Sequence, residues 1–230
     1  MARGVTWRYN MFDDPMRLSG YRGQLTAEHF LLMRIPRRFW EASYDQIEPG
    51  TREVVHSYLA RIDTMLDSGV GILFWGENGR GKTSAAVVVA KEARRRGASV
   101  LMTTAASMVD SVIQKTEVED GLLIDRAKSV DFLLIDDLGK EHDAASGFSA
   151  RMFENLIRER VANKLTTWIT TNMGRDAMVA RYGGTDGGGI ARSSMMEVLK
   201  EAVIPVKVEG ENRRDAIGEK TLRAVIGNTG

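Results

Sequence analysis

The chain contains no cysteine and only three histidines among its 230 residues. Disulfide bonds and cysteine-ligated zinc sites are therefore excluded. The histidines stand far apart and show none of the short spacings that are typical of metal ligands: His29, His56 and His142. We therefore expect that a metal ion reaches this protein only together with a bound ligand.

A strong net charge is missing too, because 32 basic and 31 acidic side chains leave a formal charge of +1. Nucleic-acid binding would then depend on local patches and not on the field of the whole molecule. No apolar run approaches the roughly 20 residues that cross a bilayer, and residues 1–8 lack the apolar core of a signal peptide. We therefore expect a cytoplasmic protein with no membrane-spanning segment.

What the chain does contain is a globular composition, with 43% hydrophobic and 27% charged residues. Its length suits one main domain with an appendage. Residues 1–50 show weak periodicity and hold aromatic residues among many arginines, so we interpret them as an N-terminal arm and lead-in that binds a partner. A short helix is predicted there, after Thr26 and before Pro36. Residues 51–230 are expected to form the main domain.

Apolar residues recur at helical spacing over residues 51–68, which predicts one helix that leads into the domain. From residue 70, short apolar runs alternate with helical patterns. Strands are predicted over residues 70–75, 99–103, 132–135, 166–171 and 202–208, and helices over 82–96, 105–114, 122–128, 148–163 and 193–200. This alternation is typical of a five-stranded parallel sheet flanked by helices. The glycine-rich residues 183–189 are expected to form a mobile loop.

Residues 76–83 fit the phosphate-binding pattern G-x-x-x-x-G-K-[ST], between an apolar strand and an Ala/Val-rich helix. The glycines let backbone N–H groups point at phosphate oxygens, next to the positive end of the helix dipole. Lys82 is expected to neutralise the β- and γ-phosphates of ATP, and Thr83 to place its hydroxyl on Mg²⁺. The predicted nucleotide-binding residues of this loop are Gly76, Glu77, Asn78, Gly79, Arg80, Gly81, Lys82, Thr83 and Ser84.

Three polar residues follow two later strands. Asp136 and Asp137 come directly after the apolar residues 132–135, and Asn172 follows residues 166–171. Because the carboxyl ends of parallel strands meet at one edge of the sheet, these side chains should lie next to the phosphate loop. We expect Asp136 to complete the Mg²⁺ shell, Asp137 to orient or deprotonate the attacking water, and Asn172 to sense the γ-phosphate.

Together these motifs resemble the AAA+ ATPases of the DnaC/DnaI helicase-loader and IstB type, a group that includes loaders encoded by phages. The sharpest marker is the acidic pair followed by Leu-Gly within residues 133–141, and further matches lie at residues 35–44 and 206–214. The resemblance implies a P-loop NTPase fold with little or no lid domain. It also implies an ATP-dependent oligomer that binds single-stranded DNA and a partner, typically the hexameric replicative helicase of DnaB type.

In such an oligomer the neighbouring subunit supplies a cation to the γ-phosphate. The family places this arginine directly before an apolar-x-Glu turn, whereas here Ser194 holds that place and Arg192 lies two residues earlier. Arg192 is the best-placed candidate, with Arg181 as the reserve. Arg214 matches the second sensor of the family, which touches the nucleotide within its own subunit.

Three functions are compatible with the sequence. The first is a loader of a replicative helicase, and the second is an IstB-like ATPase helper of a DNA transposase. The third is an ATPase that does not act on nucleic acid. The short, aromatic-rich arm favours the loader. DNA contacts are expected where residues 104–107 open a helix, with Lys115 nearby, because hydroxyls and backbone amides bind phosphates there.

Overall fold

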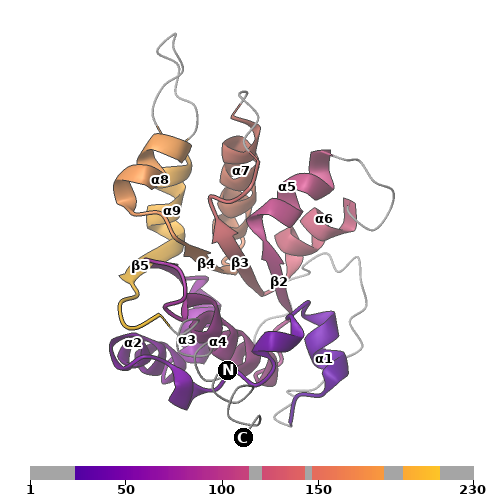
Figure 1. The fold of residues 1–230 in the computed structure, drawn as a ribbon. Coiled ribbons are helices and arrows are strands. Elements are labelled where there is room, and N and C mark those ends of the chain that lie inside the picture. Colours follow the sequence, from indigo (N-terminus) through magenta and orange to yellow (C-terminus); the bar gives the residue numbers. More distant parts are fainter. Residues whose placement is uncertain (1–23, 114–120, 143–146, 184–193, 213–230) are drawn as a thin grey trace, which may run out of the picture.

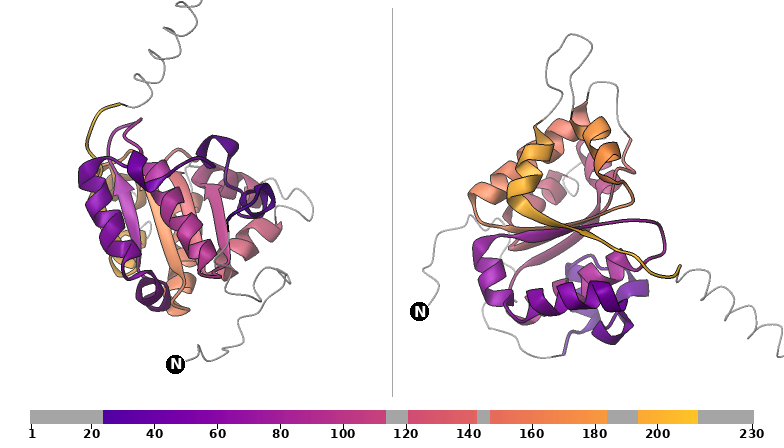
Figure 2. Two further views of the ribbon diagram at one scale, coloured as in Figure 1. Left: turned by 90° about the horizontal axis from the view of Figure 1, so that it is seen from below. Right: turned by 90° about the vertical axis from the view of Figure 1, so that its left-hand side faces the viewer.

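The computed structural model of the chain describes residues 24–113, 121–142, 147–183 and 194–212. A sheet of parallel strands lies between two layers of helices (Figures 1 and 2). The strand order is β2-β3-β4-β1-β5. The strands are β1 (Gly71–Trp75), β2 (Val100–Thr104), β3 (Phe132–Leu138), β4 (Thr166–Thr171) and β5 (Val203–Lys207). The prediction of a five-stranded parallel sheet flanked by helices is confirmed.

The end of β3 differs from the prediction, because the strand runs on past residue 135 to Leu138. Its pairing with β4 is irregular between Ile135 and Leu138, and Asp137 adopts a left-handed backbone conformation with φ 57°. Asp136 and Asp137 therefore belong to the end of β3 and do not follow it. The apolar pattern could not show this, since two of the three extra residues, Asp136 and Asp137, are charged.

One layer of helices comprises α1 (Ala27–Leu32), α2 (Pro49–Leu59), α3 (Ile62–Ser68) and α4 (Lys82–Arg95), in the lower half of Figure 1. The prediction of a single helix over residues 51–68 is wrong, because the helix is interrupted at Ala60 and Arg61. The break lets α2 pack on α4 while α3 packs on β4. Gly69 ends α3 in the left-handed conformation, as a C-terminal glycine usually does.

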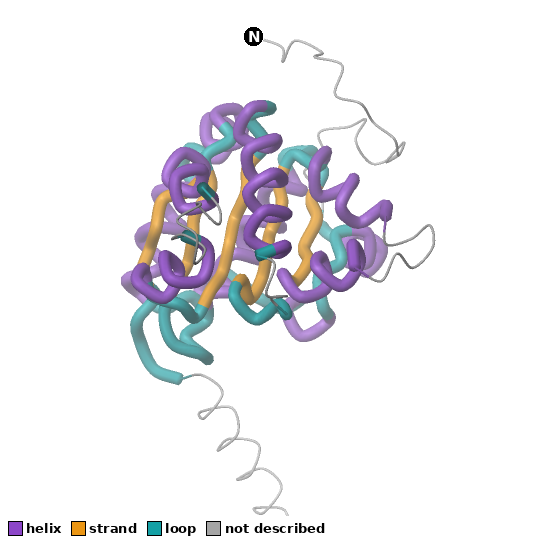
Figure 3. The backbone as a smooth tube through the Cα atoms, turned by 90° about the horizontal axis from the view of Figure 1, so that it is seen from above, coloured by secondary structure: helices purple, strands orange, loops and turns teal. Residues whose placement is uncertain are grey.

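The opposite layer comprises α5 (Ala105–Ile113), α6 (Gly121–Ser129), α7 (Phe148–Ala162), α8 (Arg175–Tyr182) and α9 (Met195–Ala202). Figure 3 looks down on this layer, with the strands visible between the helices. The sequence did not predict α8. Most of the glycine-rich residues 183–189 lie outside the described residues. None of the helices in the described ranges is long and apolar enough to cross a membrane.

The lead-in segment before α2 packs firmly on the domain. The Met33 carbonyl in this segment accepts a hydrogen bond from the backbone N–H of Met102 on β2, at 2.8 Å. The indole of Trp40 stacks on Phe30, with ring centroids 5.1 Å apart, and Lys91 of α4 donates to the carbonyl of Trp40. Two short 3-10 turns, η1 (Arg37–Phe39) and η2 (Tyr44–Gln46), lie in this segment. Residues 1–23 lie outside the described ranges, and the domain boundary at residue 50 stays a prediction.

Candidate functional site

The phosphate loop connects β1 to α4 and requires glycine at several positions. Gly76, Gly79 and Gly81 all have positive φ, at 139°, 77° and 86°. A Cβ atom at Gly76 would lie 2.5 Å from the carbonyl oxygen of Val208, and one at Gly79 would lie 1.9 Å from Oδ1 of Asn212. The loop is therefore curled tightly against the segment that follows β5, in a conformation that L side chains rarely adopt.

The first residue of α4 brings the ends of two strands together. The Nζ atom of Lys82 donates hydrogen bonds to the carbonyls of Gly76 and Glu77, at 2.8 and 2.7 Å, and to Oδ1 of Asn172 at 2.9 Å. The lysine is only 6% exposed. A buried ammonium group held by acceptors at the loop is positioned to bind an anion. Lys82 and Asn172 thus meet, as the sequence predicted, although 90 residues separate them.

The next side chain, Thr83, donates from Oγ1 to Oδ1 of Asp136 at 2.7 Å. The same carboxylate oxygen accepts a second bond, from Thr170 of β4 at 2.5 Å. Burial raises the pKa of Asp136, while these two hydrogen bonds act to lower it. Thr170 was not among the predicted site residues, although it stands on β4 only two residues before Asn172.

A hydroxyl and a carboxylate oxygen are ligands of the kind that Mg²⁺ takes. Among the described residues, no group of three or more His, Cys, Asp or Glu side chains is placed to hold a metal ion. The chain therefore offers Thr83 and Asp136, and phosphate oxygens and water would complete the shell. That division suits Mg²⁺, which usually keeps few protein ligands beside a nucleotide.

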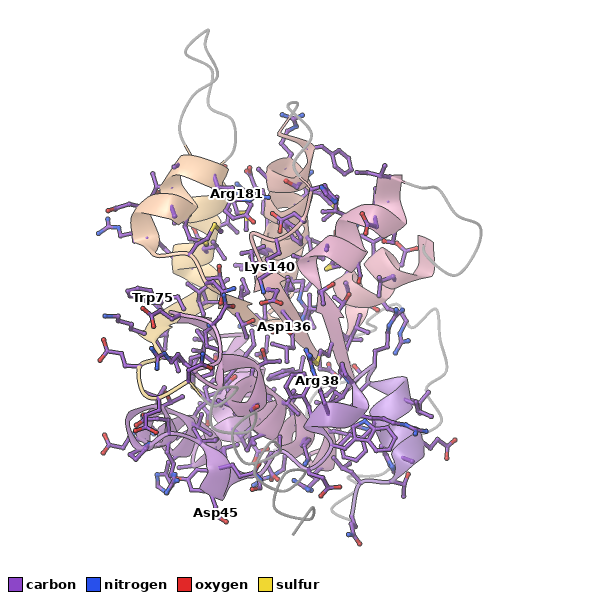
Figure 4. The ribbon with its side chains drawn as sticks, in the orientation of Figure 1. Arg38, Asp45, Trp75, Asp136, Lys140 and Arg181 are labelled. Carbon is purple, nitrogen blue, oxygen red and sulfur yellow. The ribbon has the colours of Figure 1, made fainter. Side chains whose placement is uncertain are left out.

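The second carboxylate of β3 has a different environment. The side chain of Asp137 is 35% exposed, and its Oδ2 lies 2.9 Å from Nζ of Lys140. The Asp137 N–H donates to Oγ1 of Thr170 at 3.0 Å, which ties the turn to β4. Asp136 and Lys140 are labelled in Figure 4, at the same edge of the sheet. The Asp137 carboxylate is thus open to solvent beside the buried Asp136.

A buried ion pair lies behind this turn. The side chain of Glu141 has no exposed surface; it accepts hydrogen bonds from the backbone of Gly139 at 2.8 Å, from Arg181 Nη2 at 3.1 Å and from the hydroxyl of Tyr182. Arg181 also donates to the Glu141 carbonyl at 2.7 Å. The guanidinium of Arg181 is thus paired with Glu141 inside the subunit, and its role as a reserve cation for a neighbouring subunit stays a prediction.

A cavity of about 270 Å³ lies between the phosphate loop and the segment after β5. Arg80 lines this cavity and donates hydrogen bonds to the Gly210 carbonyl and to the carboxylate of Glu77. The hydrogen bond and the positive charge of Arg80 lower the pKa of Glu77. On the other side Lys207 lies 5.6 Å from the ring centroid of Trp75. The wall residues are Trp75, Gly76, Glu77, Arg80, Asn172, Gly174, Lys207, Val208, Glu209 and Gly210.

Three of the predicted residues, Arg192, Arg214 and Lys115, lie outside the described residues. At the start of α5, Oγ1 of Thr104 accepts from the N–H of Ser107 at 3.0 Å. This hydrogen bond caps the helix, so the hydroxyl that we expected to meet DNA already has a partner in the chain.

Known proteins resemble this chain in sequence and in fold. The family model of IstB-like ATP-binding proteins matches residues 37–214. A comparison with curated protein sequences gives no match. Among solved structures, the DnaC helicase loader is similar with a TM-score of 0.60 and 18% identity, over 76% of this chain and 100% of that one.

Two further structures show the same likeness. DnaI has a TM-score of 0.62 and 22% identity, over 78% of this chain and 94% of that one. A primosome component from Streptococcus pyogenes serotype M3 has a TM-score of 0.62 and 19% identity, over 87% and 99%. At these identities the likeness shows the fold, which is a P-loop fold of AAA+ type. The family model spans most of the 230 residues, and the chain therefore belongs to the family of IstB-like ATP-binding proteins.

Proposed function

We propose that this protein is a Mg²⁺-dependent ATPase of DNA replication that loads a hexameric helicase of DnaB type onto single-stranded DNA. The observation that carries the ATPase part is the meeting of three strand ends. Lys82 bonds to Asn172, and Thr83 bonds to Asp136, at the carboxyl edge of β1, β3 and β4. This arrangement supports hydrolysis of a bound triphosphate, because it gathers a phosphate-binding cation, metal ligands and a polar sensor.

Each residue of the site has a distinct part in this proposal. Lys82 exchanges its hydrogen bonds to the loop carbonyls for hydrogen bonds to phosphate oxygens, and Asn172 senses the terminal phosphate by a hydrogen bond. Thr83 and Asp136 would hold Mg²⁺, which supplies neutralisation of charge on the phosphates. Asp137, open to solvent, accepts the proton of the attacking water. We also propose that Arg214 contacts the nucleotide within its own subunit and that Arg192 contacts the nucleotide bound by a neighbouring subunit.

The helicase and the DNA in this proposal are inferred from solved structures that are similar to this chain. One similar structure is named as a helicase loader and another as a primosome component. We infer from these names, and from the aromatic-rich residues 1–24, that the partner is a replicative helicase and that the chain self-associates around single-stranded DNA. The cytoplasm is the compartment in which such a reaction takes place.

An IstB-like helper of a DNA transposase is the second candidate, and the description of the matching family favours it. The two candidates share the ATP site and differ in their nucleic acid and their protein partner. A helper holds duplex DNA for a transposase, whereas a loader delivers a helicase to a single strand.

A loading assay distinguishes them. The protein is mixed with ATP, a DnaB-type helicase and a circular single-stranded DNA without free ends, and the helicase retained on the circle is measured. We expect retention to rise with the wild-type protein and to stay at background with the Lys82→Ala variant. No retention, together with ATP-dependent binding of duplex DNA, would favour the transposase helper.

A further inference from the structure

Glu141 is a buried carboxylate that the proposed reaction does not use. It lies three residues after the end of β3, and both of its carboxylate oxygens accept hydrogen bonds. Oε2 accepts from the backbone N–H of Gly139 at 2.8 Å. Oε1 accepts from Nη2 of Arg181 at 3.1 Å and from the hydroxyl of Tyr182. This carboxylate therefore joins two segments of the chain, because each oxygen is bound by donors from a different one.

The first of these segments is the turn that carries Asp137. The N–H of Lys140 donates to the Asp137 carbonyl at 3.1 Å, which closes a turn over residues 137–140. Asp137 and Gly139 both have positive φ, at 57° and 100°. A residue other than glycine keeps such a conformation only where its surroundings hold it. The hydrogen bond from Gly139 to Glu141 is one of the contacts that hold this turn.

The second segment is the end of α8, where Arg181 and Tyr182 are the last two residues. Tyr182 has no exposed surface. Burial raises the pKa of Tyr182, so its hydroxyl stays protonated and donates a hydrogen bond to Glu141. Arg181 also donates to the backbone carbonyl of Glu141, at 2.7 Å. The end of α8 therefore holds both the side chain and the backbone of Glu141.

The residues between β4 and α8 contact the same turn. Oγ1 of Thr171 donates to the carbonyl of Leu138 at 2.7 Å. A Cβ atom at Gly139 would lie 2.4 Å from Cε of Met173, so this side chain packs directly on the turn. Thr171 and Met173 are the two neighbours of Asn172, the proposed sensor. The turn is therefore held between the sensor segment and the end of α8.

We propose that Glu141 is a positioning residue, which holds the turn over residues 137–140 in the conformation that presents Asp137 to the attacking water. The inference rests on the proposed role of Asp137 as the proton acceptor. Glutamine at position 141 would offer a single acceptor oxygen, so it could not bind both the Gly139 N–H and the donors of α8. A displacement of about 1 Å at a reacting group can lower turnover about 10²-fold. The geometry of this turn therefore affects the rate directly.

The test compares Glu141→Gln with Asp131→Asn, a matched loss of a carboxylate at the other end of β3. The Asp131 carboxylate accepts hydrogen bonds from the N–H and the hydroxyl of Ser99, at 2.9 and 2.8 Å. Phosphate release and ATP affinity are measured with Mg²⁺ at a temperature at which circular dichroism shows each variant to be folded. We expect Glu141→Gln to lower kcat roughly tenfold or more at unchanged ATP affinity. Asp131→Asn should match the wild type in both.

Tyr182→Phe tests the same contact with a milder change, because it removes a single hydroxyl. Its control is Tyr58→Phe, since Tyr58 is also buried and its hydroxyl donates to the carbonyl of Val70 at 2.9 Å. Tyr182→Phe should lower kcat several-fold at unchanged ATP affinity, and Tyr58→Phe should leave kcat unchanged. Equal effects of the two substitutions on kcat would overturn the proposal, because they would reflect a general loss of stability.

A double variant separates positioning from a general effect. If Glu141 acts through Asp137, adding Glu141→Gln to Asp137→Asn should cause no further loss of turnover. A second loss of the same size in the double variant would show that Glu141 does not act through Asp137, and would overturn the proposal.

Exchange of the Gly139 amide hydrogen, followed by NMR, tests the turn without hydrolysis. In Glu141→Ala, which removes both acceptor oxygens, this exchange should be roughly tenfold faster, as the loss of a hydrogen bond predicts. Unchanged exchange would overturn the proposal. A wild-type protein that releases no phosphate would instead remove the proposed ATPase function, and the exchange of Gly139 would still decide whether Glu141 holds the turn.

Discussion

Two adjacent carboxylates at the end of β3 occupy opposite environments. Asp136 is 3% exposed and accepts hydrogen bonds from Thr83 and Thr170. Asp137 has a left-handed backbone conformation at the irregular end of the strand, is partly exposed, and pairs with the exposed Lys140. A buried acceptor suits a metal ligand, and an accessible carboxylate suits a proton acceptor. The difference in environment therefore supports separate roles for the two residues.

The first prediction concerns Lys82. The Lys82→Ala variant should lose tight ATP binding, because the phosphates lose a buried cation whose charged hydrogen bonds each contribute about 1.5–3 kcal/mol. Calorimetry should show an affinity at least roughly tenfold weaker. The melting temperature should change little, since the glycines of the loop keep its conformation. Equal nucleotide affinity in variant and wild type would mean that the phosphates bind elsewhere.

The second prediction concerns Asp137. The Asp137→Asn variant should bind ATP and Mg²⁺ normally, because Thr83 and Asp136 remain, and should hydrolyse ATP about 10²–10⁴-fold more slowly, since a general base is lost. Phosphate release under saturating ATP measures the turnover. Unchanged turnover would assign the base to another residue, and that residue is not Glu141, whose carboxylate is buried and bonded to Arg181 and Tyr182.

The sequence predicted some of these residues and not others for a physical reason. Lys82 and Asp136 follow from motifs, because a local pattern of glycines and a strand end determines where such side chains lie. The bond of Thr170 to Asp136 and the pairing of Arg181 with Glu141 join segments that meet only in the folded chain. A local pattern does not determine which side chains such segments place in contact, so the sequence could not predict these partners.

At the level of elements, the predictions succeeded where burial is continuous. β3 and β4 are buried along nearly their whole length and read as apolar or β-branched runs. α8 was missed because only Met178 and Tyr182 are buried in it, which leaves too weak a helical pattern. The break between α2 and α3 was missed because the apolar spacing continues across it, and only packing against α4 and β4 requires the bend.

Arg160 joins several of these elements and carries the third prediction. It has no exposed surface and donates to Oγ1 of Thr167 at 2.9 Å. Its other bonds go to the carbonyls of Ala127, Val130 and Thr166. The Arg160→Leu variant removes the donor from several buried acceptors, each of which costs about 1–3 kcal/mol when left unpaired, so we expect the free energy of unfolding to fall by at least about 3 kcal/mol.

Urea unfolding followed by circular dichroism measures this loss. Arg158→Leu is the control, because Arg158 lies on the same helix with a side chain that is 57% exposed and pairs with Glu154. Surface pairs contribute little, so the control should change stability by less than about 1 kcal/mol. Similar effects of the two substitutions would show that Arg160 does not hold α7 to the sheet.

At the level of the whole molecule, the fourth prediction concerns the N-terminal residues. Deletion of residues 1–24 should abolish co-purification with the replicative helicase. The melting temperature and ATP affinity should stay nearly unchanged, because Leu25 is the first core residue among those that the structure describes. A large loss of stability with the helicase still bound would contradict the partner-binding role and would mean that the segment packs on its own domain.

The last prediction concerns the neighbouring subunit. The Arg192→Ala variant should hydrolyse ATP slowly while its isolated subunit keeps normal ATP affinity, because a trans-acting cation contributes only when a neighbour docks against the bound nucleotide. Mixing tests this directly. Lys82→Ala subunits cannot bind ATP but keep Arg192, so they should restore phosphate release to Arg192→Ala subunits in proportion to the number of mixed interfaces. If no mixing ratio restores activity, the site is not shared through Arg192, and the cation must come from another residue.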